Sequence, residues 1–166
     1  MVWKARQSPL VDQLFCLPGN PGIAQIAQCV PIAVHDSDRI VRFCIENQVE
    51  LVLVGPEAPL TTGLSDSLDE AGIKAFGPKA RAAILEGSKS FAKQFMQRHG
   101  IPTARFAVFS DLAQAQSHVD QIDYPIVIKA SGLAAGKGVL LPDNREESQA
   151  ALRQIMLDHE FGAAGD

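Results

Sequence analysis

The chain has 166 residues, of which 46% are hydrophobic and 20% are charged, and its formal net charge is −4. The hydrophobic content is sufficient for a buried core, while the charge excludes the basic surface that binds nucleic acid or an anionic membrane. No apolar run approaches the roughly 20 residues that a membrane-spanning helix needs. No signal peptide is recognisable after Met1, so we expect a cytoplasmic protein that acts on small molecules.

The cysteines and histidines form no metal-binding or disulfide pattern. Cys16, Cys29 and Cys44 are odd in number, widely spaced and without a CxxC pair, so we expect reduced, mostly buried thiols. The histidines lie in polar stretches and are interpreted as surface or helix-end residues: His35, His99, His118 and His159. The sequence therefore predicts no metal ligand within the chain, and it identifies no catalytic side chain.

The first 80 residues predict an α/β unit. Apolar runs of strand length occur at residues 14–17, 32–34, 51–54 and 73–76. Helices are expected at residues 1–7, around 40–45 and around 64–71. The run at 51–54 contains no polar residue, which is typical of a parallel strand buried on both faces. Strands that alternate with helices through short connections indicate a parallel sheet.

Two turn clusters, residues 18–22 and 55–60, follow predicted strands of this unit. Ligands of parallel sheets bind beyond the carboxyl ends of the strands, so both clusters are candidate site segments. Glu57 lies between Pro56 and Pro59, which stiffen the backbone and could direct its carboxylate at a ligand hydroxyl or amine. The alternative, which residue type alone favours, is a glutamate that caps the next helix or faces solvent.

Residues 81–166 predict helices around one hairpin. We expect helices at residues 81–85, 89–99, 111–119 and 145–157, and a strand at 106–109. Ser88 is the expected N-cap of the second of these helices. Apolar residues at helical spacing are expected to pack in two of the helices: Phe91, Phe95 and Met96 in one, Ala150, Ala151, Ile155 and Met156 in the other. No element is expected at residues 160–166.

The most informative stretch is 124–141, where two β-branched runs flank Gly132–Gly138. Three glycines in these seven residues allow close approach of the backbone and leave N–H groups to face an anion. Lys129 and Lys137 add charge suited to phosphate. Lys89 begins a predicted helix, where a cation is unfavourable unless an anion is nearby. Together these features predict a clamp for nucleotide phosphates.

The spacing differs from that of the common phosphate loop. Three residues rather than four separate Gly132 from Gly136, and Gly138 stands where a magnesium-binding Ser or Thr would follow. For this stretch taken alone, a flexible hairpin with incidental lysines remains the alternative.

Three blocks of sequence resemble one enzyme family when they are taken together. These are Leu-Val-Gly-Pro-Glu-Ala-Pro-Leu at 53–60, the segment 76–93 with Leu-Glu-Gly-Ser-Lys-Ser-Phe-Ala-Lys at its end, and Val-Ile-Lys-Ala-Ser-Gly-Leu-Ala-Ala-Gly-Lys-Gly-Val at 127–139. In order and spacing they resemble the phosphoribosylamine-glycine ligases, or glycinamide ribonucleotide synthetases, of the ATP-grasp class. The resemblance implies a Rossmann-like (pre-ATP-grasp) domain at residues 1–80 and the first part of an ATP-grasp domain at residues 81–166.

The resemblance also implies an activity and a site. In this family ATP phosphorylates the carboxylate of glycine, and the amine of 5-phosphoribosylamine attacks the acyl phosphate to give glycinamide ribonucleotide. The residues that match the family's ATP-binding positions are Lys89, Lys129, Ser131, Gly132, Ala135, Gly136, Lys137 and Gly138. The residues that match turns beside the phosphoribosylamine site are Gly19, Asn20 and Glu57.

Two departures from the family qualify this interpretation. Family members begin with a strand and a glycine-rich turn upstream of the position of Met1, and they carry the adenine-binding hinge and the magnesium ligands beyond that of Asp166. We therefore expect a fragment that is unstable and inactive by itself. Two alternatives remain: a non-catalytic nucleotide-binding module, and another ATP-grasp carboxylate-amine ligase, which should lack the block at 55–60.

Overall fold

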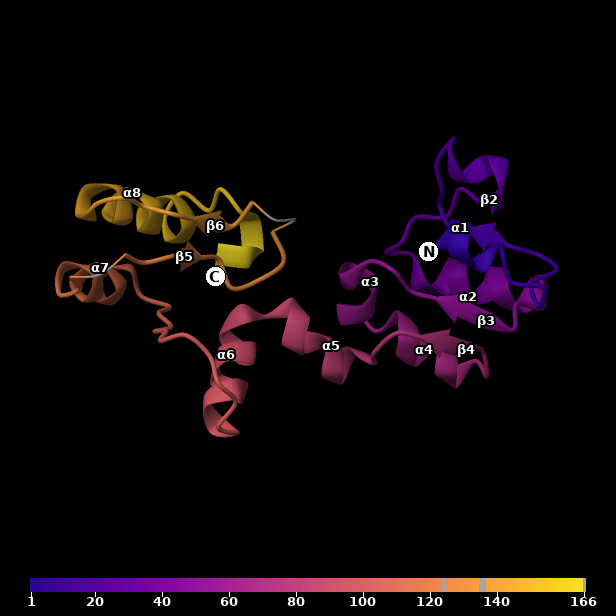
Figure 1. The fold of residues 1–166 in the computed structure, drawn as a ribbon, viewed down its shortest axis with the longest axis horizontal. Coiled ribbons are helices and arrows are strands. Elements are labelled where there is room, and N and C mark those ends of the chain that lie inside the picture. The colour runs from indigo at the N-terminus through magenta and orange to yellow at the C-terminus, as the bar shows by residue number, and fades with distance from the viewer. Residues whose placement is uncertain (124, 135–136, 166) are drawn as a thin grey trace. The chain divides into compact units, whose positions relative to one another are not determined.

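The computed structural model describes residues 1–123, 125–134 and 137–165, and the chain divides into two compact units, Met1–Ala83 and Ile84–Asp166 (Figure 1). The division falls within helix α5 (Ala80–Gly87). In the described part of the chain, no helix is long and apolar enough to cross a membrane.

The first unit contains two small parallel sheets. Strand β1 (Phe15–Cys16) pairs with β2 (Gln28–Cys29), and β3 (Leu51–Leu53) pairs with β4 (Lys74–Phe76). The α/β class with parallel pairing is therefore confirmed. The strands are shorter than the apolar runs that predicted them.

The strand predicted at residues 32–34 is wrong. The parallel ladder with β1 lies earlier, at β2, and its last bond runs from the N–H of Val30 to the oxygen of Cys16 at 3.0 Å. Pro31 follows, and because proline has no backbone N–H it cannot extend the ladder. Ile32 instead buries its side chain in the core of the first unit.

Besides α5, the described residues of the first unit form five helices, of which three contribute to one apolar core (Figure 1). In chain order they are α1 (Val2–Ala5), the 3₁₀ helix η1 (Ile23–Gln25), α2 (Ser37–Glu46), α3 (Glu57–Thr61) and α4 (Leu64–Glu70). Asp36 caps α2, as expected, by accepting a hydrogen bond from the N–H of Arg39 at 3.2 Å. The core gathers residues from α2, α3 and α4, including Ile40, Cys44, Leu60, Leu64 and Leu68.

Only one face of the β3–β4 pair is covered, so the prediction of a strand buried on both faces is wrong. Val52 and its register partner Ala75 pack against the core. On the opposite face Leu51 is 55% exposed, Leu53 is 43% exposed and Phe76 is 70% exposed. A continuous apolar run thus marks a strand, but it did not reveal how many faces are packed.

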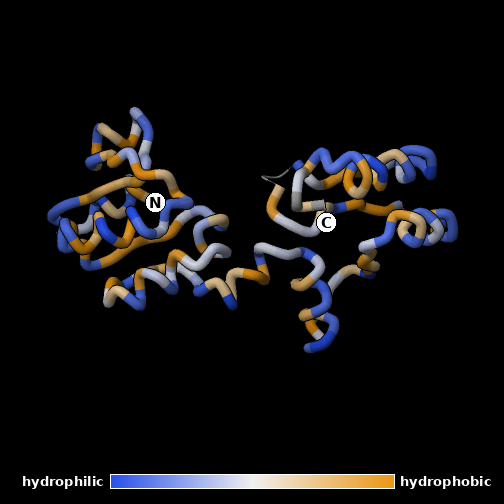
Figure 2. The backbone as a smooth tube through the Cα atoms, turned by 180° about the vertical axis from the view of Figure 1, so that it is seen from behind, coloured by the Kyte–Doolittle hydropathy of each residue, from blue (hydrophilic) through white to orange (hydrophobic). Residues whose placement is uncertain are grey.

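The second unit is built from helices and one antiparallel hairpin. Its elements are α6 (Lys89–Arg98), α7 (Leu112–Asp120), β5 (Ile128–Lys129), β6 (Val139–Leu140), α8 (Arg145–Met156) and the 3₁₀ helix η2 (Gly162–Gly165). Ser88, Asp111 and Asn144 cap α6, α7 and α8 through side-chain oxygens. Helices α7 and α8 lie side by side (Figure 1) and share a cluster of buried residues, Ala115, Val119 and Leu152. Figure 2 shows hydrophobic and hydrophilic residues interspersed along the backbone of the second unit.

Several expectations for the second unit need correction. Residues 106–109 form no strand, and Phe109 instead packs against α7, with its ring centroid 5.0 Å from that of His118. In α8, Ala150 is exposed and Leu152 takes its place in the packed face. The apolar residues Phe91, Phe95 and Met96 of α6 are half-buried rather than buried. The end of the chain, where no element was expected, forms η2.

Candidate functional site

The glycine-rich segment is a loop closed by the β5–β6 hairpin, as the sequence predicts. Lys129 pairs with Val139 in the antiparallel register, and the N–H of Ala130 donates to the oxygen of Gly138 at 2.8 Å. Of the predicted site residues in this loop, Ala135 and Gly136 lie outside the described residues. The N–H groups of Leu133 and Ala134 make no hydrogen bond to another described residue, which leaves them able to face a ligand.

Two of the glycines are required by packing. A Cβ atom on Gly132 would lie 2.8 Å from the Cα atom of Ala164, and one on Gly138 would lie 2.8 Å from the Cβ atom of Ala134. Gly132 also donates its N–H to the oxygen of Ala164 at 3.0 Å, which ties the loop to η2. The glycines therefore let the loop close on itself and on η2, in addition to any role toward a ligand.

The first turn of α6 is joined to the start of the loop. The N–H of Lys89 donates to the backbone oxygen of Ser131 at 2.8 Å, and the N–H of Ser90 donates to Ser131 Oγ at 3.3 Å. The hydroxyls of Ser88 and Ser90 lie 3.3 Å and 2.7 Å from Ser131 Oγ. Sequence analysis predicted Ser88 only as a helix cap and gave Ser90 no role, because local patterns carry no signal for contacts between distant segments.

Three lysines of the predicted site differ in their surroundings. Lys89 is half-buried, and its Nζ atom donates to the backbone oxygen of Gly132 at 2.9 Å. The side chains of Lys129 and Lys137 are exposed and make no hydrogen bond or ion pair with another described residue. The hairpin thus combines free ammonium groups with free backbone amides, an arrangement suited to a polyanion.

The turn after β1 contains Gly19 and Asn20, and both have structural roles. Gly19 has φ of +80°, and a Cβ atom there would lie 2.3 Å from Cys29 Sγ. Asn20 Oδ1 accepts a hydrogen bond from the N–H of Ile23 at 2.9 Å, at the start of η1. The carbonyl oxygen of this side chain is therefore engaged, while its NH₂ group has no partner among the described residues.

Glu57 is the first residue of α3, where a carboxylate is favoured by the helix dipole. Its side chain is exposed and makes no hydrogen bond or ion pair with another described residue. Pro56 is the N-cap residue, so Glu57 does not cap the helix through its side chain. The carboxylate is free to meet a ligand or water.

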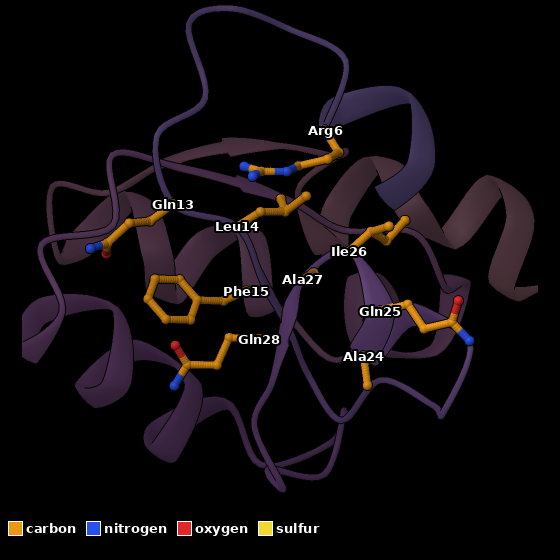
Figure 3. Close-up of a pocket in the computed structure, with 9 residues that line it drawn as sticks. All are labelled: Arg6, Gln13, Leu14, Phe15, Ala24, Gln25, Ile26, Ala27 and Gln28. Atoms are coloured by element: carbon orange, nitrogen blue, oxygen red, sulfur yellow. The ribbon is translucent and has the colours of Figure 1, made fainter.

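A hollow of about 420 Å³ lies elsewhere in the first unit (Figure 3). It is lined by residues of α1, β1, η1 and β2 and the segments beside them: Arg6, Gln13, Leu14, Phe15, Ala24, Gln25, Ile26, Ala27 and Gln28. Arg6 is the only charged residue in this set, and none of the predicted site residues belongs to it. Leu14 and Gln28 lie at the amino-terminal ends of the paired strands, whereas Gly19 and Asn20 follow the carboxyl end of β1. The hollow therefore contains none of the predicted site residues, although Ala24 in its lining donates its N–H to the oxygen of Asn20 at 2.9 Å.

Two of the three thiols lie in surroundings that disfavour the thiolate. Cys16 and Cys29 are register partners on β1 and β2 and are half-buried, so only Cys44 fulfils the expectation of burial; all three are free. Burial, and secondarily the neighbouring Cys29, raises the pKa of Cys16, and burial raises the pKa of Cys44. Because the thiolate is the nucleophilic form, both groups are less reactive at neutral pH than an ordinary cysteine.

Comparison with known families accounts for the whole chain. Residues 1–86 match the model described as phosphoribosylglycinamide synthetase, N domain, and residues 87–166 match the ATP-grasp (A) domain of the same synthetase. The first segment contains the turns that follow β1 and β3, and the second contains the β5–β6 hairpin.

Individual proteins agree with this match. The chain is 47% identical over 167 residues to a phosphoribosylamine–glycine ligase of Allochromatium vinosum, covering 99% of this chain and 39% of the relative. It is 48% identical over 169 residues to the trifunctional purine biosynthetic protein adenosine-3 of Gallus gallus, covering 100% of this chain and 17% of the relative. The crystal structure of a phosphoribosylamine–glycine ligase from Thermotoga maritima matches with a TM-score of 0.68 and 31% identity, over 90% of this chain and 35% of that one.

The chain therefore spans two fifths or less of the length of these relatives. The resemblance drawn from the three sequence blocks is confirmed by both family matches. The chain belongs to the phosphoribosylglycinamide synthetase family, and it matches the N domain and the ATP-grasp (A) domain of that family in succession.

Proposed function

We propose that this chain forms part of a ligase that uses ATP to join glycine to 5-phosphoribosylamine and so makes glycinamide ribonucleotide. The names of the relatives and the two consecutive family matches support this assignment. The block at residues 55–60, which another ATP-grasp ligase should lack, also favours it over that alternative.

The observation that carries the proposal is the junction between Lys89 and the glycine-rich loop. The ammonium group lies 2.9 Å from the oxygen of Gly132, at the base of a loop with free amides and two further lysines. We assign Lys89 and Lys129 to the phosphates of ATP. The loop positions Ser131, Gly132, Ala135, Gly136, Lys137 and Gly138 are assigned to the same site, either as ligand contacts or as its support.

The reacting groups need position and charge neutralisation rather than a protein nucleophile. The glycine carboxylate attacks the terminal phosphorus of ATP, ADP leaves, and a glycyl phosphate forms. The amine of 5-phosphoribosylamine then attacks the acyl carbon, and inorganic phosphate and a proton are released as the amide bond forms. Cations and oriented amides stabilise the charge that develops on the phosphoryl oxygens. We assign residues 1–80 to the amine substrate, with Gly19, Asn20 and Glu57 beside it, and residues 81–166 to ATP.

Magnesium is expected as the partner of ATP in this family. The described residues contain no cluster of three or more His, Cys, Asp and Glu side chains.

A chimeric enzyme tests the proposal. This chain would replace the matching residues of the Allochromatium vinosum ligase, with which it shares 47% identity. We expect the chimera to form glycinamide ribonucleotide from ATP, glycine and 5-phosphoribosylamine. Nucleotide binding without product, in a folded chimera, would favour the non-catalytic alternative.

A further inference from the structure

We propose that Ser131 is a positioning residue, which docks the base of the glycine-rich loop on the first turn of α6 and so sets the place of Lys89. This inference rests on the proposed ATP site. It also changes the role of Ser131, which the sequence comparison with the family had assigned to direct contact with ATP.

The first step concerns the amide groups that begin α6. The first N–H groups of a helix have no partner within the helix and often bind anions. In α6 these groups are occupied. Lys89 N–H donates to the oxygen of Ser131, Ser90 N–H to Ser131 Oγ, and Phe91 N–H to Ser88 Oγ at 3.2 Å. The next group, Ala92 N–H, bonds to the backbone oxygen of Ser88. The first turn of α6 therefore offers no free amide to a phosphate.

The second step concerns the capacity of the Ser131 hydroxyl. A serine hydroxyl donates one hydrogen bond and accepts two. Ser131 Oγ already has three partners: the N–H of Ser90 at 3.3 Å, Ser90 Oγ at 2.7 Å and Ser88 Oγ at 3.3 Å. No hydrogen-bonding capacity remains for a phosphate oxygen.

The third step concerns Lys89, whose backbone N–H and side-chain Nζ atom are hydrogen-bonded to two adjacent residues of the loop. Its backbone N–H is bonded to Ser131, and its Nζ atom is bonded to the oxygen of Gly132. Gly132 is fixed in turn by its bond to Ala164. The base of the loop is thus anchored on α6 and on η2. Both bonds of Lys89 go to backbone oxygens, and the Ser131 hydroxyl adds the bonds to Ser88 and Ser90 that hold the loop against the first turn of α6. Loss of this hydroxyl would therefore loosen the position of Lys89 relative to the loop.

Exchange of backbone amides for deuterium in the chimeric ligase, without nucleotide, tests the docking itself. In Ser131→Ala we expect the amide of Ser90 to exchange about fivefold faster, since a net hydrogen bond is worth roughly 1 kcal/mol and its loss exposes the amide. The amide of Phe91, which Ser88 caps, should change little. Ser131→Thr should restore the slow exchange because it keeps the oxygen.

ATP affinity tests the consequence, and it should be measured on the same variants. We expect Ser131→Ala to weaken ATP binding about fivefold, Ser131→Thr to retain it, and Ser90→Ala, which keeps the Ser90 amide, to weaken it less. If Ser131→Ala does not fold, Thr and Val at this position provide the comparison, because they share a shape and differ in the hydroxyl.

The outcomes separate the two proposals. Faster exchange at Ser90 in a chain that binds no ATP even as wild type would support the docking role and contradict the proposed ATP site. Weaker ATP binding with unchanged exchange would mean that Ser131 contacts the nucleotide directly, and would overturn the inference. Unchanged exchange and unchanged affinity in the Ala variant, or equal behaviour of Thr and Val, would overturn it as well.

Discussion

The Nζ atom of Lys89 donates a hydrogen bond to the backbone oxygen of Gly132 at 2.9 Å, across 43 positions of sequence. Gly132 belongs to the loop that is proposed to cover the triphosphate. Lys89 is therefore hydrogen-bonded to this loop without a ligand. A phosphate oxygen carries a full negative charge and is a stronger acceptor than a carbonyl oxygen. We therefore expect ATP to draw the ammonium group away from Gly132.

Substitution of Lys89 should weaken ATP binding in the chain. Lys89→Met keeps much of the apolar stem and removes the charge, and hydrogen bonds to charged groups are worth about 1.5 to 3 kcal/mol, so we expect a loss of roughly 10- to 100-fold. Titration calorimetry with ATP measures it. Lys93→Met is the matched control on the same helix, because Lys93 bonds to Thr103 rather than to the loop. Equal losses in the two variants would contradict a specific role for Lys89.

The packing of Gly132 predicts a loss of stability on substitution. Gly132→Ala places a Cβ atom 2.8 Å from the Cα atom of Ala164, and overpacking of this kind costs about 1 to 3 kcal/mol. Urea denaturation followed by circular dichroism measures the free energy of unfolding. At Gly55 the nearest atom to an added Cβ is the flexible Met1 Sδ at 3.1 Å, so Gly55→Ala should stay within about 0.5 kcal/mol. An unchanged free energy of unfolding in Gly132→Ala would show that the loop does not pack against η2.

The buried thiol of Cys44 predicts a dependence of stability on pH. Burial raises the pKa of Cys44 above its ordinary value of 9.0, so the folded protein keeps this proton at a pH where the unfolded chain loses it. The contribution to stability is present below about pH 9 and falls as pH rises above that value. Denaturation at several pH values should show this fall, and Cys44→Ala should reduce it. A fall of the same size in the variant would assign the effect to other groups.

The exposed face of the β3–β4 pair predicts self-association of this chain. Leu51, Leu53 and Phe76 share one face and are largely exposed, which is a liability for aggregation. Phe76→Lys should reduce light scattering and the binding of a hydrophobic dye while leaving the unfolding free energy nearly unchanged. Val52→Lys, on the covered face, is the control and should unfold the first unit. Unchanged scattering in Phe76→Lys would show that this face does not drive association.

Local signals in the sequence predicted local structure well. A cap at Ser88 and a helix from residue 111 were expected, and Ser88 and Asp111 cap α6 and α7, because a cap depends on residues within one turn. The hairpin around the glycine-rich loop was predicted for the same reason. The strand expected at 32–34 failed because Pro31 ends the ladder that had already formed at Gln28–Cys29.

Contacts between distant segments could not be predicted. The docking of Ser131 on Ser88 and Ser90 joins residues more than 40 positions apart, and no periodicity in the sequence encodes it. The exposed face of β3 was missed because an apolar run does not reveal how many elements cover it. The assignment of Lys89 and Lys129 to a phosphate site came from their places in the sequence and from the resemblance between sequence blocks, and it remains a prediction at the level of single residues.

A crystal structure of the chimeric ligase with ATP bound tests the central claim most directly. The account predicts that Lys89 Nζ lies about 3 Å from a phosphate oxygen, the length of a charged hydrogen bond, with its bond to Gly132 released and the loop closed over the triphosphate. A nucleotide bound elsewhere, with Lys89 still on Gly132 and the loop open to solvent, would contradict it.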